Sequence, residues 1–335
     1  MQITGTLPQN GVLVSDTLDS AGGTIRTITP TSAIVLQSKT VTPSSAQQII
    51  TPDTGYNALS QVIVNAENGP DWDAFVSKTY PQHIVLSTAT LIPDYLFSGT
   101  GIQTISGDSV INIGTTGFGA PGRSFLNCTN LTSISFPNAI YAGTYSFDGC
   151  SNLTTVNLPK MQTMGRTGAD GYCFRGTKIT SLYLPELTET IGVGVFRSFG
   201  SSSNKVTIVL PKFTTMGGNT FRSSYIAVLD LGPTFTGQIS NDSLYQGHCD
   251  VLILRSTTLV SAYNTESIAA LDANSTVYIP KVLYDHLDDG TEYDYKAATN
   301  WSSKTTITWA QIEGSQYENY YANGVEIPVQ QGGGS

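Results

Sequence analysis

The chain repeats one pattern, first as Phe125-Leu-Asn-Cys-Thr-Asn-Leu-Thr-Ser-Ile-Ser-Phe-Pro137 and then as Phe147-Asp-Gly-Cys-Ser-Asn-Leu-Thr-Thr-Val-Asn-Leu-Pro159. Weaker copies follow, and the prolines that end successive copies lie 22, 26, 26 and 22 residues apart, at Pro137, Pro159, Pro185, Pro211 and Pro233. Repeats of this length are typical of stacked, solenoid-like folds, in which each copy contacts its neighbours.

Each copy contains a short segment in which apolar and polar residues alternate, as in Ile134-Ser-Phe136. Alternation of this kind predicts a strand with one face turned inward. The proline that follows ends the strand because it has no N–H to donate to a neighbour. One copy cannot bury its own apolar face, so we expect the copies to stack into a mainly β solenoid.

The pattern resembles the BspA-type leucine-rich repeats of bacterial surface proteins and phage tail-associated proteins. Ser146-Phe-Asp-Gly-Cys150 and Ile191-Gly-Val-Gly-Val-Phe196 carry the resemblance best, and it covers roughly residues 85–280. The insertions Gly114–Gly122 and Gly165–Gly171 depart from it. The resemblance implies an irregular leucine-rich-repeat solenoid that binds rather than catalyses.

A different segment, Lys39–Ala66, lies upstream and reads as two β arms around the turn Pro52-Asp-Thr-Gly55. It is similar to a module of tail and minor structural proteins from phages that infect Gram-positive bacteria. The resemblance implies a virion protein of tail-fibre or baseplate type. It also implies that residues 1–67 attach the chain to other virion proteins.

These patterns predict four regions. Residues 1–67 form an N-terminal β attachment module, and residues 68–84 form a linker and a capping helix with Trp72 and Phe75 on one face. Residues 85–280 form the solenoid. Residues 281–335 form a C-terminal cap and a flexible tail, in which Tyr295–Trp301 resembles the helix that closes phage proteins of this repeat type.

Composition excludes several kinds of partner. Charged residues make up 12% of the chain, about half of the usual share. The net charge is −9, and the 16 basic residues form no run, which disfavours nucleic acid. No stretch is long and apolar enough for membrane insertion, and Met1-Gln-Ile-Thr-Gly5 does not resemble an export signal.

Motifs for catalysis or cofactors are weak. Gly117–Gly122 matches G-x-G-x-x-G but lacks the strand, helix and acidic residue of a nucleotide site. His248 and Cys249 are neighbours on an expected strand and would point to opposite faces. Cys128 and Cys150 share one repeat position, and a buried thiol slot is favoured there over a disulfide or metal ladder. We therefore predict no enzyme activity and no cofactor.

One acidic segment, Asp285–Asp294, is the densest group of oxygen ligands. Calcium binds six to eight such ligands, but the spacing of a known calcium loop is absent. A solvated acidic turn is the favoured interpretation, so we predict no metal site. The weaker alternative is calcium bound by Asp285, Asp288, Asp289, Glu292 and Asp294.

The outward positions of the expected strands change in character along the chain. The early copies present polar side chains, for which we predict a glycan- or protein-binding face, at Ser133, Ser135, Thr155, Asn157, Ser181 and Tyr183. The late copies present an apolar stripe at Val209, Val228, Val251 and Ile253. Two interpretations of the stripe stay open, namely a cover formed by residues 256–335 and a docking patch for another subunit or the tail.

These observations lead to a hypothesis of function. The chain is expected in the virion, with a glycan or protein of the host cell surface as its partner, and a homo-oligomer is compatible with this role. A bacterial cell-surface adhesin is the alternative, and a polysaccharide hydrolase is a distant third because no pair of carboxylates faces one expected cleft.

Overall fold

The computed structural model describes residues 13–18, 24–29, 62–64, 83–86, 89–115 and 122–319. The chain divides into two compact units, Met1–Thr116 with Pro121–Leu158 and Gly117–Ala120 with Pro159–Ser335. The expected capping helix, most of the Lys39–Ala66 module, Gly117–Pro121 and the glycine-rich end lie outside the described residues.

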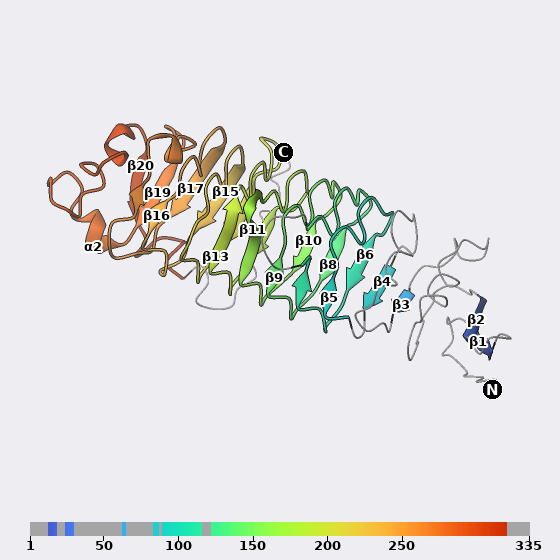
Figure 1. Cartoon of the computed structure of the whole chain (residues 1–335). Coiled ribbons are helices and arrows are strands. Elements are labelled where there is room, and N and C mark those ends of the chain that lie inside the picture. The colour runs from blue at the N-terminus through green and yellow to red at the C-terminus, as the bar shows by residue number, and fades with distance from the viewer. Residues whose placement is uncertain are drawn as a thin grey trace, which may run out of the picture. The chain divides into compact units, whose positions relative to one another are not determined.

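The first unit is built from short parallel strands (Figure 1). One sheet has the order β10-β8-β6-β4-β3, and another set pairs β5, β7 and β9. A separate antiparallel hairpin pairs β1 with β2. The bounds are β1 (Leu13–Leu18), β2 (Thr24–Thr29), β3 (Val62–Val64), β4 (His83–Leu86), β5 (Leu91–Ile92), β6 (Thr104–Ser106), β7 (Asn112–Ile113), β8 (Ser133–Ser135), β9 (Tyr141–Ala142) and β10 (Thr155–Asn157).

The second unit also stacks parallel strands, in a six-stranded sheet of order β12-β14-β15-β17-β19-β20. Two further parallel pairs are β11 with β13 and β16 with β18. The bounds are β11 (Thr163–Asp170), β12 (Ser181–Tyr183), β13 (Glu189–Val193), β14 (Val206–Val209), β15 (Tyr225–Asp230), β16 (Gln238–Ile239), β17 (His248–Ile253), β18 (Ser261–Ala262), η3 (Glu266–Ile268), β19 (Thr276–Ile279), α2 (Lys281–Tyr284), η4 (Trp301–Ser303) and β20 (Thr308–Gln311).

The inward side chains form the core that the repeat pattern predicts. Leu131, Ile134 and Phe136 are completely buried in the first unit, as are Val206, Ile208 and Leu210 in the second. The phenylalanines that open the repeats stack on one another, with centroids 5.3 Å apart for Phe97 and Phe125 and 5.4 Å apart for Phe125 and Phe147. Ring stacking of this kind stabilises the fold by more than the burial of apolar surface alone.

A turn with two left-handed residues recurs in seven copies among the described residues. The two residues are always four positions apart, and the buried Phe, or Leu244 in one copy, lies midway between them. The pairs are Tyr95 and Gly99, Arg123 and Asn127, and Tyr145 and Gly149 in the first unit, and Tyr172 and Gly176, Gly194 and Ser198, Asn219 and Ser223, and Asp242 and Gln246 in the second. Glycine adopts this conformation without strain, which explains Gly149 at φ +73°.

Several expected boundaries differ from the structure. The strand Val62–Val64 of the upstream module pairs in parallel with β4, and β20 continues the solenoid sheet past residue 280. The insertion after Gly165 continues as strand in β11, which pairs with β13. The expected closing helix Tyr295–Trp301 is wrong, because the backbone there forms turns and Asn300, at φ +69°, interrupts right-handed helical geometry before η4.

Candidate binding site

The outer face of β8 and β10 in the first unit carries the predicted polar ladder. The parallel register places Thr155 beside Ser133 and Asn157 beside Ser135, and Asn157 Nδ2 donates to Ser135 Oγ at 2.9 Å. Thr155 and Asn157 are exposed, while the two serines are half-buried. A continuous row of hydroxyl and amide groups therefore faces outward.

The same ladder extends by one strand that the sequence prediction omitted. Thr104 and Ser106 of β6 lie in register with Ser133 and Ser135 of β8. The signal was present in the weak early copy around Ile102-Gln-Thr-Ile105, where Thr104 takes the outward position. In the second unit, the predicted residues Ser181 and Tyr183 lie on β12, and 38% of Tyr183 is exposed.

A second surface feature consists of tyrosines and arginines on the repeated turns. In the first unit, the Arg123 guanidinium lies 5.6 Å from the ring centroid of Tyr95 and 4.7 Å from that of Tyr145. Arg123 also donates to the Tyr95 hydroxyl at 2.7 Å. In the second unit, Arg175 and Arg197 lie 4.6 and 5.1 Å from the ring of Tyr172. The sequence prediction missed this feature, although Tyr95, Arg123, Tyr145 and Tyr172 each lie two positions before a repeat Phe.

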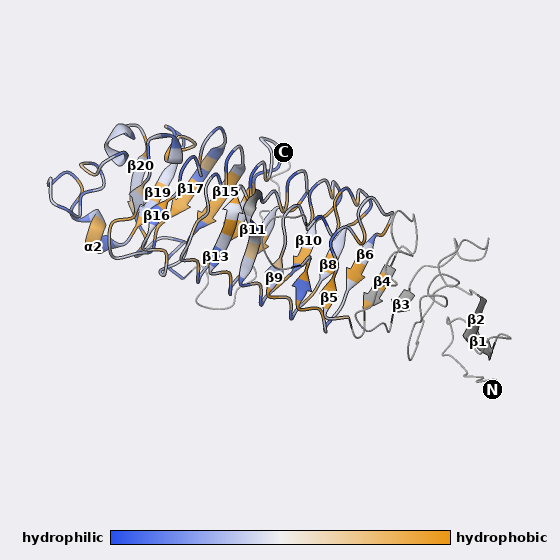
Figure 2. Cartoon of the chain, in the orientation of Figure 1, coloured by the Kyte–Doolittle hydropathy of each residue, from blue (hydrophilic) through white to orange (hydrophobic). Residues whose placement is uncertain are grey.

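The predicted apolar stripe of the late copies lies in the second unit and is covered by the chain itself. Ile312 and Tyr317 pack on Val228 and Ile253, with Val251 and Tyr278 at the margin. Val209 is also buried. Figure 2 shows the hydrophobic character of β15 and β17, which carry much of this stripe. This packing corrects the alternative of a docking patch at Val228 and Ile253, because Ile312 and Tyr317 already occupy that surface.

An ion pair holds the covering segment in place. Arg255 Nη2 donates to Asp230 Oδ2 at 2.8 Å and to the carbonyl oxygen of Tyr317 at 2.6 Å. The Asp230 side chain is fully buried, and 10% of the Arg255 side chain is exposed. Burial raises the pKa of Asp230, and the Arg255 guanidinium opposes that rise.

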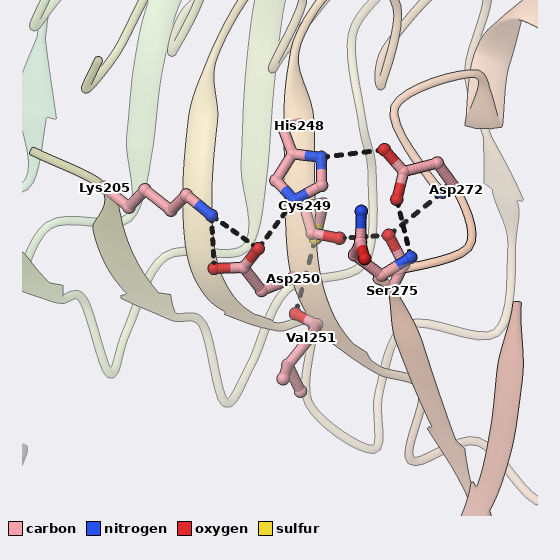
Figure 3. A network of polar contacts seen from close by, with 8 residues as sticks. Lys205, His248, Cys249, Asp250, Val251, Asp272 and Ser275 are labelled. Carbon is pink, nitrogen blue, oxygen red and sulfur yellow. Dashed lines mark hydrogen bonds and ion pairs between the residues drawn. The ribbon is translucent and has the colours of Figure 1, made fainter. Parts of the chain in front are cut away.

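His248 lies in a polar network rather than in a catalytic dyad (Figure 3). Its Nε2 contacts Asp250 at 2.6 Å and its Nδ1 contacts Asp272 at 3.1 Å, while Lys205 contacts Asp250 at 2.6 Å. Cys249 is completely buried, its thiol directed to the carbonyl of Val251, and burial raises its pKa. The network joins Lys205, the residue before β14, to β17 and the turn before β19, which indicates a structural role.

Cys128 and Cys150 lie in the predicted thiol slot of the first unit. The Cys128 thiol donates to the carbonyl of Phe97 at 2.7 Å, and the Cys150 thiol donates to that of Phe125 at 3.0 Å. Both are free cysteines, and burial raises the pKa of Cys150 well above its usual value. Thr177 of the second unit donates to the carbonyl of Phe174, three residues before it in the chain.

The acidic segment pairs with its own neighbours. Asp285 contacts Lys281, Asp288 contacts Lys296, and Asp289 contacts His286. Asp294 accepts backbone N–H groups from Gly290 and Lys296. Among the residues that the structure describes, no group of three or more His, Cys, Asp or Glu side chains is arranged to hold a metal ion. The alternative calcium site is therefore not assembled from its five predicted ligands, Asp285, Asp288, Asp289, Glu292 and Asp294.

A pocket of about 680 Å³ opens in the closing region, between α2 and β20. The half-buried Trp309 contributes aromatic surface to it and packs against the buried Trp301. Lys296, Lys304 and Asp288 contribute charge. The sequence prediction assigned these residues to a cap and missed the pocket.

None of the helices in the described ranges is long and apolar enough to cross a membrane.

Comparison with known proteins agrees with the repeat pattern. Residues 120–249 match the BspA type leucine rich repeat region in six copies. No curated protein matches the chain.

Two solved structures are similar. A leucine-rich repeat protein from Bacteroides ovatus is 12% identical, with a TM-score of 0.26, over 89% of this chain and 98% of that one. A leucine rich cell surface protein from Faecalibacterium prausnitzii is 12% identical, with a TM-score of 0.21, over 94% of this chain and 96% of that one.

The predicted fold class is confirmed. The chain is mainly β, its described parallel strands stack as a β-solenoid, and residues 120–249 match BspA-type leucine-rich repeats.

Proposed function

We propose that this chain is a virion protein of tail-fibre or baseplate type, whose solenoid binds a glycan or protein on the host surface. The binding role is inferred from the outer face of β6, β8 and β10. It offers one row of hydroxyls and amides in strict register, partly or fully exposed. Solenoids of this kind provide extended surfaces that are typical of binding proteins rather than enzymes.

The virion setting is supported by the similarity of Lys39–Ala66 to a module of phage tail proteins. In this proposal, residues 1–67 attach the chain to other virion proteins, and the repeats contact the host. The strand β3 of that module pairs with β4, so the proposed attachment segment continues directly into the repeat sheet.

The test has two parts. Mass spectrometry of purified particles should detect the chain, and recovery with the cell envelope but not with particles would favour the bacterial adhesin instead. The purified chain should bind host cells, and Asn157→Lys should weaken that binding because a long cation replaces the amide that bridges two strands. Lys212→Gln serves as the control, since Lys212 lies on an exposed turn away from the ladder and its ammonium pairs with Glu186. Equal binding by both variants would reject this face as the contact surface.

A further inference from the structure

The pocket of the closing region has a rigid aromatic wall. The ring centroids of Trp301 and Trp309 are 5.6 Å apart, and Tyr295 contacts both rings, at 5.3 and 5.1 Å. Trp301 Nε1 donates to the carbonyl of Val260 at 2.9 Å, and the Tyr295 hydroxyl accepts the N–H of the same residue at 2.8 Å. These bonds fix Trp301 and Tyr295, and both rings pack against Trp309, so little ordering would be needed on binding.

The charges in the wall leave a small positive excess. Lys296 pairs with Asp288 at 2.5 Å, whereas the Lys304 ammonium donates to the carbonyl of Leu271 at 2.9 Å. An ammonium has three donors, so the bond to Leu271 leaves donors of Lys304 for a ligand. Burial lowers the pKa of Lys304, which indicates that its charge is incompletely hydrated. The lining holds two ammonium groups and one carboxylate, and Asp272 outside the lining adds a negative charge that acts on Lys304, so the site favours a ligand with no more than a single negative charge.

The volume of about 680 Å³ lies within the range of pockets that hold small molecules. We propose that this pocket binds one carboxylate-bearing sugar unit of an acidic saccharide. The half-buried Trp309 offers ring surface to the C–H face of the sugar, the buried Trp301 supports that ring, and Lys304 pairs with the carboxylate of the sugar. Ser302, Thr305 and Asp288 supply groups for its hydroxyls.

Other ligand classes fit the pocket less well. A nucleotide could stack on the indoles, but its more highly charged phosphates would face the Asp288 carboxylate. An acidic peptide would pair with Lys304 but offers no C–H face matched to the ring surface. The site is separate from the outer strand face, so the inference does not depend on the virion role.

The three tryptophans of the chain allow a direct test. Trp72→Phe leaves Trp301 and Trp309, both in the pocket wall, as the remaining indole fluorophores. The full chain with this substitution would be titrated with sialyllactose, a glucuronate-containing tetrasaccharide, neutral maltotetraose, AMP and triglutamate. We expect a saturable fluorescence change with at least one of the two acidic saccharides, and weaker binding of the other three probes.

Variants of Lys304 separate binding from folding. Lys304→Gln should weaken binding of the acidic saccharide about tenfold, equivalent to about 1.4 kcal/mol. Lys304→Arg should retain most of the affinity because it retains the charge. Lys281→Gln is the control, since Lys281 is exposed, pairs with Asp285 and does not line the pocket. Thermal unfolding of each variant would verify that it is folded.

Three results would overturn the inference. The first is the absence of saturable binding by either acidic saccharide. The second is equal or tighter binding of maltotetraose, AMP or triglutamate. The third is a folded Lys304→Gln variant that binds as well as Lys281→Gln.

Discussion

Arg255 donates through Nε and Nη2 to the carboxylate of Asp230, at 3.0 and 2.8 Å to Oδ2, inside the second unit. The same guanidinium donates to the carbonyl of Tyr317, so one side chain joins a solenoid strand to the segment that covers it. Breaking a buried pair costs more than breaking an exposed one, because the remaining charge loses its partner without regaining water.

Arg255→Ala should therefore reduce the free energy of unfolding by about 3–5 kcal/mol, as measured by urea denaturation. The loss should be smaller at low pH. Without Arg255, burial opposes only the Gly232 N–H at Asp230, so the folded pKa of Asp230 stays above the usual value of 3.8. The folded state then binds more protons than the unfolded state, and the stability of the variant falls as pH rises above 3.8 toward that folded pKa.

The control for this variant is Lys212→Ala, which breaks the exposed pair with Glu186. That change should alter stability by about 0.5 kcal/mol or less. Similar losses for Arg255→Ala and Lys212→Ala would contradict the structural role of the buried pair.

Phe125→Ala should destabilise the first unit by about 3–5 kcal/mol, because it removes the middle ring of the Phe97, Phe125 and Phe147 stack. Phe125→Leu should cost clearly less, since most of the buried volume remains. Chemical denaturation would give both values. The exposed Tyr263→Ala provides a comparison, and a cost for Phe125→Ala no larger than for that change would argue against the stack as the core.

Two substitutions of Cys150 test whether the thiol slot needs a hydrogen-bond donor. Cys150→Thr should be nearly neutral, since Thr100 and Thr177 already place a hydroxyl at this repeat position. Cys150→Val has a similar shape but no donor, whereas Thr100 and Thr177 each donate to the carbonyl three residues earlier, so the valine variant should cost about 1 kcal/mol relative to the threonine variant. Thermal unfolding of the two variants side by side would measure the difference.

The buried thiols should also resist alkylation. Burial raises the pKa of Cys150 and Cys249, so each stays protonated and inaccessible at mildly alkaline pH. Mass spectrometry after iodoacetamide treatment should find both unmodified in the folded chain and modified in urea. Rapid labelling of the folded chain would contradict this placement.

Calcium should leave the chain unchanged. Asp285, Asp288 and Asp289 each already pair with a basic side chain of the closing region. We expect the same melting temperature in calcium and in EDTA, as measured by scanning fluorimetry. A rise in melting temperature with calcium, absent with magnesium, would show that these carboxylates rearrange around the ion.

The sequence predicted the elements whose spacing is periodic. The alternation around Ile134 located the strands, and the shared position of Cys128 and Cys150 located a buried slot. The outward ladder was also readable, because Ser133 and Thr155 occupy equivalent places in two copies. Each of these features depends only on local pattern and on stacking between identical units.

The features that the sequence did not predict depend on contacts between distant residues. Arg255 reaches Asp230, 25 residues earlier, and Tyr317, 62 residues later. Trp301 reaches Val260, 41 residues earlier, and thereby completes the pocket wall. The prediction of a closing helix over Tyr295–Trp301 was wrong for a local reason, since a left-handed Asn300 cannot be recognised from its residue type alone.

The paired left-handed residues of the turns also determine where the chain can tolerate insertions. Their separation never varies, as in Tyr145 and Gly149 or Asn219 and Ser223, whereas the distance from one turn to the next does. Insertions and grafted loops should therefore be tolerated between turns and rejected within them. A library of altered binding proteins could keep each five-residue turn intact and vary length and side chains only in the segments that connect one turn to the next.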